Sequence, residues 1–367
     1  MEWTAEVWEK IKQKMPYATQ KANEVTHIPY SVQDGQWTPG PKGIQWWTNG
    51  FWPASMWRMY LVTKNPLYKE QAERAELMLD EAWRLSETLH HDVGFIWMLS
   101  SGVNYRLTQN PESRERTVRA ANYLMSRFNP HGFLRSWNGD MTGWAIIDCM
   151  MNLSVLYFAS ELFSDPRYKQ IAVIHADTVL RHFIRPDGSV HHIVAFDPLT
   201  GEPVEYPRGQ GIASGSSWAR GQAWAMYGFV ISYLYTREAR YLDAAKQVSH
   251  YFIANVCDDW IPACDFRAPK EPVVKDNCAG VIAACALLEL AGLVPKHEAD
   301  LYRTPAVKLI QTAAQECTDF TENTPAIMTK CTGAYHSDDH HIAMVYGDYF
   351  FIEAMHRLVN PDAMRFF

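Results

Sequence analysis

The sequence predicts an all-α fold, an (α/α)6 barrel in which six helical hairpins form a single domain over residues 1–367. Three observations lead to this prediction. Apolar segments with helical periodicity alternate with more polar helical segments, about twelve in all. Similar helix openings recur far apart in the chain, which indicates a repeated helix pair. No linker or low-complexity run divides the chain, so the pairs are expected to share one core.

The apolar segments are the predicted inner helices and the polar segments the predicted outer ones. Inner helices are expected at Phe51–Val62 and near residues 95–107, 144–162, 218–235, 277–292 and 341–358. Outer helices are expected at the amphipathic N-terminus, from Lys64 to about Leu85, and near residues 113–128, 167–184, 239–255 and 299–315. The repeat shows where Tyr68, Tyr168 and Tyr241 each stand just inside a charged helix. Strands are few, and Ser189–Phe196 is the best candidate.

Composition excludes several classes of protein. Hydrophobic residues make up 47% of the chain and charged residues 20%, so a large core is expected and disorder is not. The net charge of −7 gives no basic field, so nucleic acid is not an expected partner. No segment approaches the roughly 20 apolar residues that cross a bilayer, so no membrane partner is expected either. The 14 tryptophans suit both a core and stacking against sugar rings.

The N-terminus and the cysteines indicate the compartment. The first residues form an amphipathic pattern with early acidic side chains, which is not a signal peptide. The seven cysteines are an odd number and include no CxxC pair, a pattern typical of reduced cytosolic proteins. We therefore expect a cytoplasmic protein, either a monomer or a weak homo-oligomer.

Asp148 lies in the most informative stretch, the apolar segment from Met141 to Leu162. No Lys or Arg lies within a helical turn of it. A carboxylate in such surroundings loses more by ionising than one in water, so its pKa should rise. A general acid that works near neutral pH requires such a rise. From this stretch alone, an Asp148 that caps a helix beginning at Cys149 is an equally good interpretation.

Asp92 is the second candidate. It stands beside a glycine before a predicted helix, and taken alone it fits a helix N-cap better than a catalyst. Its neighbour His91 could be a solvated side chain. Together, Asp92 and Asp148 supply the two carboxylates that glycoside hydrolysis commonly needs.

Arg220 and Trp224 stand at positions i and i+4 of one predicted helix, with Gln210 in the loop before it. An Arg beside a Trp suits a carboxylate held by both guanidinium nitrogens, with a ring stacked alongside. An Arg stem packed on a core Trp explains the spacing equally well. The glycines around Gln210 are not a phosphate loop, because no hydrophobic strand precedes them and the Lys-Ser/Thr ending is missing.

No metal or other cofactor is expected. The sequence has no HExxH motif. The residues His91, Asp92, His340 and His341 lie in adjacent pairs, whose side chains are expected to point in different directions.

Six segments resemble, in order, those of the unsaturated glucuronyl hydrolases, glycoside hydrolase family 88. They are WTNGFWPASMW, HHDVGFIWMLS, GWAIIDCMMNL, SVHHIVAFDPLTG, GSSWARGQAWAMYGF and AYHSDDHHIAMVYGDYFFIEA, and they cover most of the chain from about Trp47 to Leu358. The resemblance implies an (α/α)6 barrel that releases a 4,5-unsaturated glucuronic acid from the non-reducing end of oligosaccharides left by polysaccharide lyases, such as glycosaminoglycan fragments. The implied reaction is hydration of the C4=C5 enol ether.

The resemblance also assigns residues. Asp148 would be the general acid and base, and Asp92 its essential partner. The substrate-binding positions would be Trp47, His91, Trp137, His192, Gln210, Arg220, Trp224, Tyr335 and His336. The implied partner is an unsaturated oligosaccharide, with a disaccharide as the shortest.

Two departures from the family pattern leave the preferred oligosaccharide open. Gly209 stands where some members have a histidine, and the chain stops at NPDAMRFF without the Ser- and Lys-bearing tail of some sulfate-tolerant members. A related hydrolase acting on unsaturated rhamnogalacturonan fragments of pectin would share the barrel and both acids. A sugar epimerase of the same barrel would instead use histidines for proton transfer. A non-catalytic sugar-binding barrel would have no use for Asp148 in an apolar helix.

Overall fold

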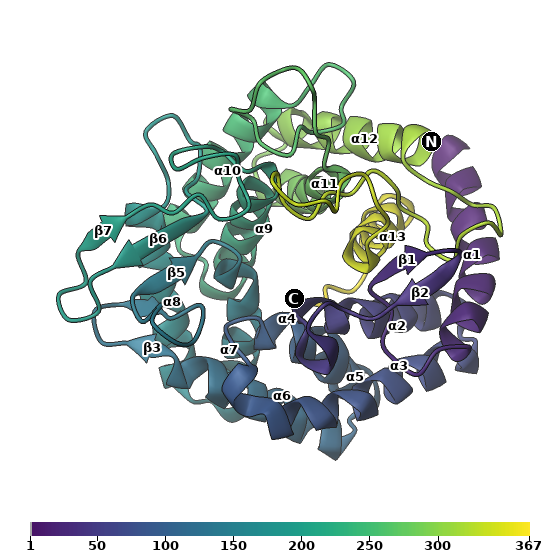
Figure 1. The fold of residues 1–367 in the computed structure, drawn as a ribbon, viewed down its shortest axis with the longest axis horizontal. Helices are drawn as coiled ribbons and strands as arrows, with labels where there is room; N and C mark the ends of the chain where they lie inside the picture. The colour runs from purple at the N-terminus through teal and green to yellow at the C-terminus, as the bar shows by residue number, and fades with distance from the viewer. Residues whose placement is uncertain (1) are drawn as a thin grey trace.

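The computed structural model describes residues 2–367, which form a closed double ring of helices (Figure 1). The inner ring consists of α2 (Phe51–Thr63), the continuous segment α4 (Val93–Trp97), η4 (Met98–Gly102, π-helical) and α5 (Val103–Thr108), then α7 (Cys149–Phe163), α9 (Ala219–Thr236), α11 (Asn277–Leu293) and α13 (Val345–Val359). The outer ring consists of α1 (Glu2–Asn23), α3 (Pro66–Leu79), α6 (Pro111–Ser126), α8 (Pro166–His182), α10 (Ala239–Asn255) and α12 (Ala299–Glu316). Each inner helix contacts the next and α13 returns to α2, so the (α/α)6 barrel is confirmed.

Burial explains which helices lie inside. Helix α11 is apolar around its whole circumference, and its residues from Asn277 to Leu287 are all buried. Outer helices bury a single stripe; in α8 the buried residues recur at Tyr168, Ala172, His175 and Val179. A helix that is apolar on all sides is stable only when neighbours surround it, whereas an amphipathic one covers the core from outside.

Two of the repeated helix openings, at α3 and α8, share a physical basis with that of α6, whereas the third, at α10, has no proline and Glu238 makes no side-chain capping hydrogen bond. Helices α3, α6 and α8 each begin with proline at the first helical position, preceded by Asn65, Asn110 or Asp165. In each case the side-chain oxygen of the preceding residue accepts a hydrogen bond from a backbone N–H of the first turn. Proline loses nothing there, since its missing N–H would have no helical partner.

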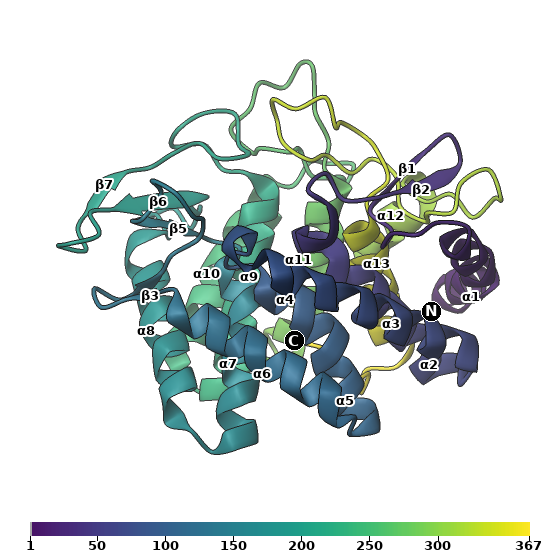
Figure 2. The ribbon, with the colours of Figure 1, turned by 60° about the horizontal axis from the view of Figure 1, so that its bottom comes forward.

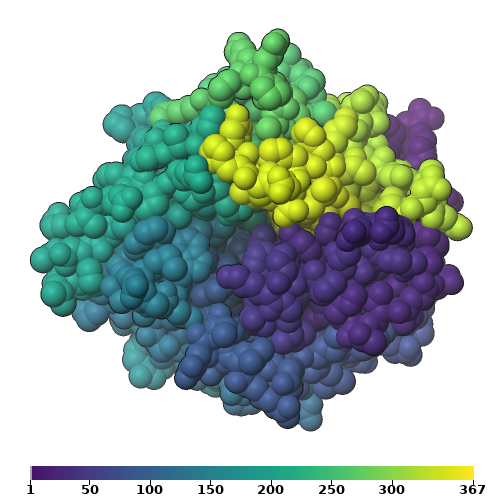
Figure 3. All heavy atoms as spheres, viewed as in Figure 1, coloured from purple at the N-terminus to yellow at the C-terminus, as the bar shows by residue number. Residues whose placement is uncertain are grey.

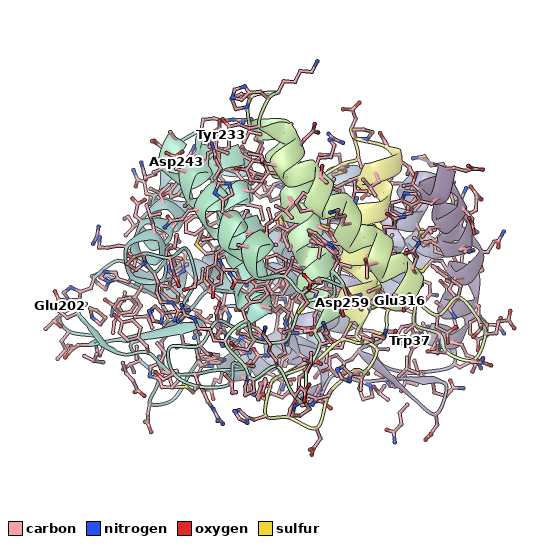
Figure 4. The ribbon with its side chains drawn as sticks, turned by 90° about the horizontal axis from the view of Figure 1, so that it is seen from above. Trp37, Glu202, Tyr233, Asp243, Asp259 and Glu316 are labelled. Carbon is pink, nitrogen blue, oxygen red and sulfur yellow. The ribbon has the colours of Figure 1, made fainter. Side chains whose placement is uncertain are left out.

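Short strands and loops gather at one end of the barrel (Figure 2). They form the hairpin β1 (Ser31–Gln33) and β2 (Gln36–Thr38), the pair β3 (Phe128–Asn129) and β4 (Phe133–Leu134), and a three-stranded antiparallel sheet of β5 (Trp144–Ile146), β6 (Ile193–Phe196) and β7 (Pro203–Glu205). Three short 3-10 helices, η1 (Gly43–Gln45), η2 (Trp47–Gly50) and η3 (Asp80–Thr88), join the inner and outer rings. Figure 4 separates the two ends: Tyr233 and Asp243 mark the opposite end, where α9 turns into α10, and Glu202 lies with the strands.

The predicted helix near residues 144–162 is partly wrong. Residues 144–146 form β5, which pairs antiparallel with β6, and α7 begins only at Cys149. The sheet requires a close approach at Gly143, where a Cβ would lie 1.7 Å from the Phe196 carbonyl oxygen. Both strands are apolar and short, and periodicity alone does not distinguish such a strand from a buried helical turn. The correction matters because it moves Asp148 from the middle of a helix to its start.

Aromatic side chains fill the barrel beneath that end. Phe95 packs against Trp47, Trp224 and Phe367, with ring centroids 5.2–6.1 Å apart. The C-terminal segment reaches this cluster from the opposite end, and Figure 1 shows the C-terminus near the centre of the ring. No helix within residues 2–367 combines the length and apolar character needed to span a bilayer.

Candidate active site

A pocket of about 290 Å³ opens where the N-terminal ends of the inner helices meet. Figure 3 shows the corresponding face of the molecule hollowed near its centre, between segments from the beginning, middle and end of the chain. The lining residues are Tyr30, Pro41, Lys42, Trp46, Trp47, His90, His91, Asp92, Trp137, Ile146, Asp148, Gln210, Trp218, Arg220, Gly333, Ala334, Ser337, Asp339 and Tyr346. The sequence candidates Asp92, Asp148, Gln210 and Arg220 therefore come together in one site.

Asp148 stands directly before α7, and its side chain makes no capping hydrogen bond. The helix-cap interpretation therefore does not account for this side chain. Burial first, and the charge of Asp92 second, raise the pKa of Asp148 to about 7. Its Oδ1 atom is buried and accepts no hydrogen bond from residues 2–367. A carboxyl group in this state can give a proton to a bound molecule near neutral pH and then take one from water.

Asp92 lies at the start of α4 and has the opposite character. His90 Nδ1 lies 3.2 Å from Asp92 Oδ2, and His91 Nε2 lies 3.2 Å from Asp92 Oδ1. Burial alone would raise the pKa of this carboxyl group, but His91 first and His90 second hold it well below its usual range. The pocket thus combines one carboxylic acid and one carboxylate, with distinct chemical roles available to each.

Asn152, one turn into α7, joins the two acids, and the sequence analysis missed it. Its Nδ2 donates to Asp92 Oδ1 and to the Asp148 carbonyl oxygen, each at 3.2 Å. Its Oδ1 accepts from the Phe95 backbone N–H at 2.6 Å. The sequence signal was an asparagine inside an apolar helical segment. The structure buries it fully, and buried polar groups need specific partners.

His192 faces Asp148 from the end of the loop before β6. The Gln210 backbone N–H donates to His192 Nδ1 at 3.0 Å, so the proton of the neutral ring lies on Nε2. Burial first and the charge of Arg220 second lower the pKa of His192 to about 3, which keeps the ring neutral at pH 7. Its Nε2 lies 3.7 Å from Asp148 Oδ1. This donor is therefore directed at the acid without blocking it.

Arg220 lines the pocket, but its terminal nitrogens already have partners. Nη1 donates to Asp276 Oδ2 and to the Thr332 carbonyl oxygen, and Nη2 donates to the Gly333 carbonyl oxygen, all at 2.6 Å. The guanidinium carbon also lies 4.6 Å from the Trp218 ring centroid. Three of the five guanidinium N–H groups are thus taken by the protein, whereas the buried Nε has no partner among the described residues.

The family of the chain follows from comparison with known proteins. The model of Glycosyl Hydrolase Family 88 matches residues 10–264. An unsaturated glucuronyl hydrolase of Bacillus sp. (strain GL1) is 34% identical over 326 residues, 85% of this chain and 86% of that protein. The chain belongs to glycoside hydrolase family 88.

Two further similar proteins support the same assignment. An unsaturated chondroitin disaccharide hydrolase of Streptococcus pyogenes serotype M1 is 31% identical over 338 residues, 87% of this chain and 84% of that protein. Among solved structures, a UGL variant with dGlcA-Glc-Rha-Glc is similar with a TM-score of 0.91 and 28% identity, over 96% of this chain and 97% of that one. The chain is therefore a glycosidase, as the sequence predicted.

The aromatic surfaces of this family-88 site differ in part from expectation. Trp47 and Trp137 line the pocket as expected, and Trp46 and Trp218 join them unpredicted. Trp224 does not: it is fully buried, with Trp47 6.4 Å away in a T-shaped arrangement. The i, i+4 spacing predicted that Trp224 and Arg220 face the pocket together. Helix α9 is buried on all sides, and one turn below Arg220 the same face packs in the core.

Tyr335 and His336 lie beside the pocket and not in its lining. The Tyr335 backbone N–H donates to the Gln210 carbonyl oxygen at 2.9 Å, and His336 Nε2 contacts the Ile212 carbonyl oxygen at 2.8 Å. Their loop instead contributes Gly333, Ala334, Ser337 and Asp339 to the lining. Gln210 lines the pocket, and its side-chain amide donates to the Gly333 carbonyl oxygen at 2.6 Å. These contacts tie two loops together at the rim.

The remaining unpredicted lining residues come from the first loops, from β5 with Ile146 and from α13 with Tyr346. Tyr30 and Lys42 precede η2, in a polar stretch with no periodic pattern to place it. His90 precedes the predicted residues His91 and Asp92 in the sequence and lines the same pocket. Together, His90, His91 and Asp92 are the residues of this pocket with the donor atoms and spacing to hold a metal ion.

Proposed function

We propose that this family-88 protein hydrolyses unsaturated glucuronyl oligosaccharides, releasing the 4,5-unsaturated glucuronic acid at the non-reducing end. The observation that carries the proposal is the pairing of Asp148, whose pKa is about 7, with the ionised Asp92 in one pocket. The names of the two curated relatives describe the same chemistry.

The proposed reaction begins with proton transfer from Asp148 to C4 of the enol ether. Positive charge then develops at C5 and the ring oxygen, where the ionised Asp92 stabilises it. Water adds at C5 and gives its proton to Asp148, which restores the acid. The resulting hemiketal opens and releases the rest of the oligosaccharide. His192, with its Nε2–H directed at Asp148, would orient the acid or the attacking water.

Substrate binding is proposed for the pocket residues Trp47, His91, Trp137 and Gln210, and for His192, which lies beside Asp148 outside the lining. The helix N-termini around the pocket favour an anionic sugar, since their unpaired N–H groups carry partial positive charge. Arg220 would contribute its charge and hold Trp218 and the Gly333 loop in place. Trp224 would support Trp47 from below, and Tyr335 and His336 would shape the rim.

The decisive experiment follows the ultraviolet absorbance of the enol ether. Unsaturated disaccharides from chondroitin, heparin and hyaluronan, and an unsaturated rhamnogalacturonan disaccharide, are each mixed with the protein. We expect the absorbance to disappear with at least one uronyl-hexosamine substrate, and not in a matched Asp148→Asn sample. Turnover of the pectin disaccharide alone would assign the protein to the related pectin-degrading activity, and no turnover of any substrate would contradict the proposal.

We further propose that the protein is cytoplasmic and a monomer or weak homo-oligomer. All seven cysteines are free in the structure, and six of them are buried with no disulfide partner, which suits a reducing compartment. Fractionation of the source cells and sedimentation velocity over a range of concentrations test these two statements separately.

A further inference from the structure

Three donor groups from consecutive residues converge on one wall of the pocket. His90, His91 and Asp92 each offer one ligand atom within 4.8 Å of the others, and no further group of three such side chains occurs in residues 2–367. Each imidazole nitrogen lies 3.2 Å from a different oxygen of Asp92, His90 Nδ1 from Oδ2 and His91 Nε2 from Oδ1. In a tetrahedral zinc site, with bonds of about 2.0–2.1 Å, neighbouring ligand atoms lie about 3.3 Å apart.

The hydrogen bonding of His91 leaves a place for a cation. His91 Nδ1 lies 3.0 Å from the Ser136 carbonyl oxygen, which can only accept, so Nδ1 carries a proton. In a neutral ring the lone pair is then on Nε2, where it faces the Asp92 oxygen. Two acceptors at this distance repel each other unless a proton or a metal ion lies between them. Both His91 Nε2 and His90 Nδ1 are buried, and beyond these 3.2 Å contacts with Asp92 they have no partner among the described residues.

The surroundings match those of metal ligands in proteins. His91, 2% exposed, is oriented through its second nitrogen by a backbone carbonyl, the usual support for a ligating histidine. Asp92 is oriented in the same way by the amide of Asn152. The pocket leaves the remaining coordination position open to water. Imidazole nitrogens with one carboxylate favour zinc over magnesium or calcium, which prefer oxygen ligands.

We propose that His90, His91 and Asp92 form a zinc-binding site and that the bound ion inhibits the enzyme. Zn²⁺ takes the place of the proton between His91 and Asp92, and that proton leaves to water. The ion then cancels the negative charge that Asp92 presents to the pocket and occupies space beside Asp148. The binding half of this proposal is independent of the proposed function, and only the inhibitory half rests on it.

Calorimetric titration of zinc chloride into the chelator-treated full-length protein tests binding. We expect one ion per chain, with affinity at least tenfold weaker in His90→Ala and in Asp92→Asn. The matched control is His341→Ala, which alters a second adjacent histidine pair; there Nε2 accepts a hydrogen bond from the Lys275 backbone N–H and faces no carboxylate cluster. Magnesium chloride should give no such signal. Absence of binding up to millimolar zinc, or a loss in the control rather than in His90→Ala, would overturn the site.

Inhibition is tested by turnover of an unsaturated disaccharide at rising zinc concentration. We expect activity to fall with a midpoint near the calorimetric dissociation constant and to return fully on chelation. In His90→Ala, whatever its own rate, the midpoint should move at least tenfold higher. Zinc that binds without inhibiting would overturn the inhibitory role, as would activity that chelation removes and zinc restores. If no substrate is turned over at all, the proposed function fails while the calorimetric result still stands.

Discussion

Burial raises the pKa of Asp148, so its carboxyl group can stay protonated near neutral pH, as a proton donor requires. We predict that Asp148→Asn lowers kcat on the order of a hundredfold or more, because the general acid is lost. Substrate should still bind, since the shape of the side chain is retained. Steady-state kinetics and equilibrium binding of an unsaturated disaccharide check both statements; a variant with a near-normal rate would remove Asp148 from the mechanism.

Gly209 determines where His192 can lie. A Cβ at this position would fall 2.0 Å from His192 Nδ1, and the backbone has φ +57°. We predict that Gly209→Ala displaces His192 and lowers kcat/KM by roughly tenfold or more, as misplacement of reacting groups does. Gly215→Ala is the matched control, because its φ of +75° imposes similar strain while nothing lies within 4 Å of the added atom. Equal effects of the two variants on activity would show that strain alone is responsible.

The sequence suggested that Arg220 binds a ligand carboxylate, whereas the structure pairs it with Asp276. A guanidinium group paired with Asp276, both side chains at most 1% exposed, belongs to the stability of the site. We predict that Arg220→Ala lowers the free energy of unfolding by about 3–5 kcal/mol, since it leaves Asp276 buried and unpaired. Denaturant unfolding measures this directly. Arg220→Lys keeps the positive charge but loses the planar guanidinium, so its free energy of unfolding should lie between those of the wild type and Arg220→Ala. A variant that weakens only KM, with unfolding unchanged, would restore the original ligand-binding interpretation.

The acid Asp148 stands directly before helix α7, and the residue that aligns it, Asn152, lies in the first turn of that helix. Asn152 touches Asp92 and the backbone of Asp148, so it acts as a positioning residue. We predict that Asn152→Ala lowers kcat by roughly tenfold to a hundredfold and moves the alkaline limb of the pH–rate profile, because Asp92 helps to set the pKa of Asp148. Ser154→Ala is the control: it removes an equally buried polar side chain of α7, whose hydrogen bond goes to Met151. Only a shift confined to Asn152→Ala supports the role.

At the scale of elements, helical periodicity predicted the barrel but not its mouth. The alternation of apolar and polar segments placed the inner and outer helices correctly, because each helix type buries a different fraction of its surface. The failure at residues 144–146 occurred where a three-residue strand depends on pairing with β6, some fifty residues away in the chain. The positions of Lys42, Trp46 and Tyr30 likewise depend on loops whose contacts have no local signature. The family resemblance indicated the candidate residues, but only the structure shows which groups hydrogen-bond to them.

In the whole molecule, the barrel brings the N-terminal ends of its inner helices to one pocket. The barrel also buries carboxyl groups whose pKa values shift in opposite directions. Burial raises the pKa of both Asp148 and Asp348 from 3.8 to about 7. Glu353 is also buried, but Arg357 and Arg58 lower its pKa from 4.5 to about 2. These groups make stability depend on pH in two directions.

We predict that the Asp148 carboxyl group opposes folding increasingly as pH rises above about 4. A group whose pKa is raised on folding stabilises fully below its unfolded pKa, and this contribution is lost as pH rises; for Asp148 and Asp348 the loss extends from about pH 4 to about pH 7. A group whose pKa is lowered stabilises above its unfolded pKa, so the contribution of Glu353 is lost as pH falls from about 4.5 towards about 2. Melting temperatures of the wild type and of Asp148→Asn, measured by calorimetry at pH 5 and pH 8, isolate this one group, because buried histidines such as His192 act on both proteins alike. Asp148→Asn cannot ionise at this position, so it should melt above the wild type at pH 8 and show a smaller gain at pH 5. A gain of the same size at both pH values would mean that the Asp148 carboxyl group is not held protonated by the fold, and its role as the proton donor would lose its physical basis.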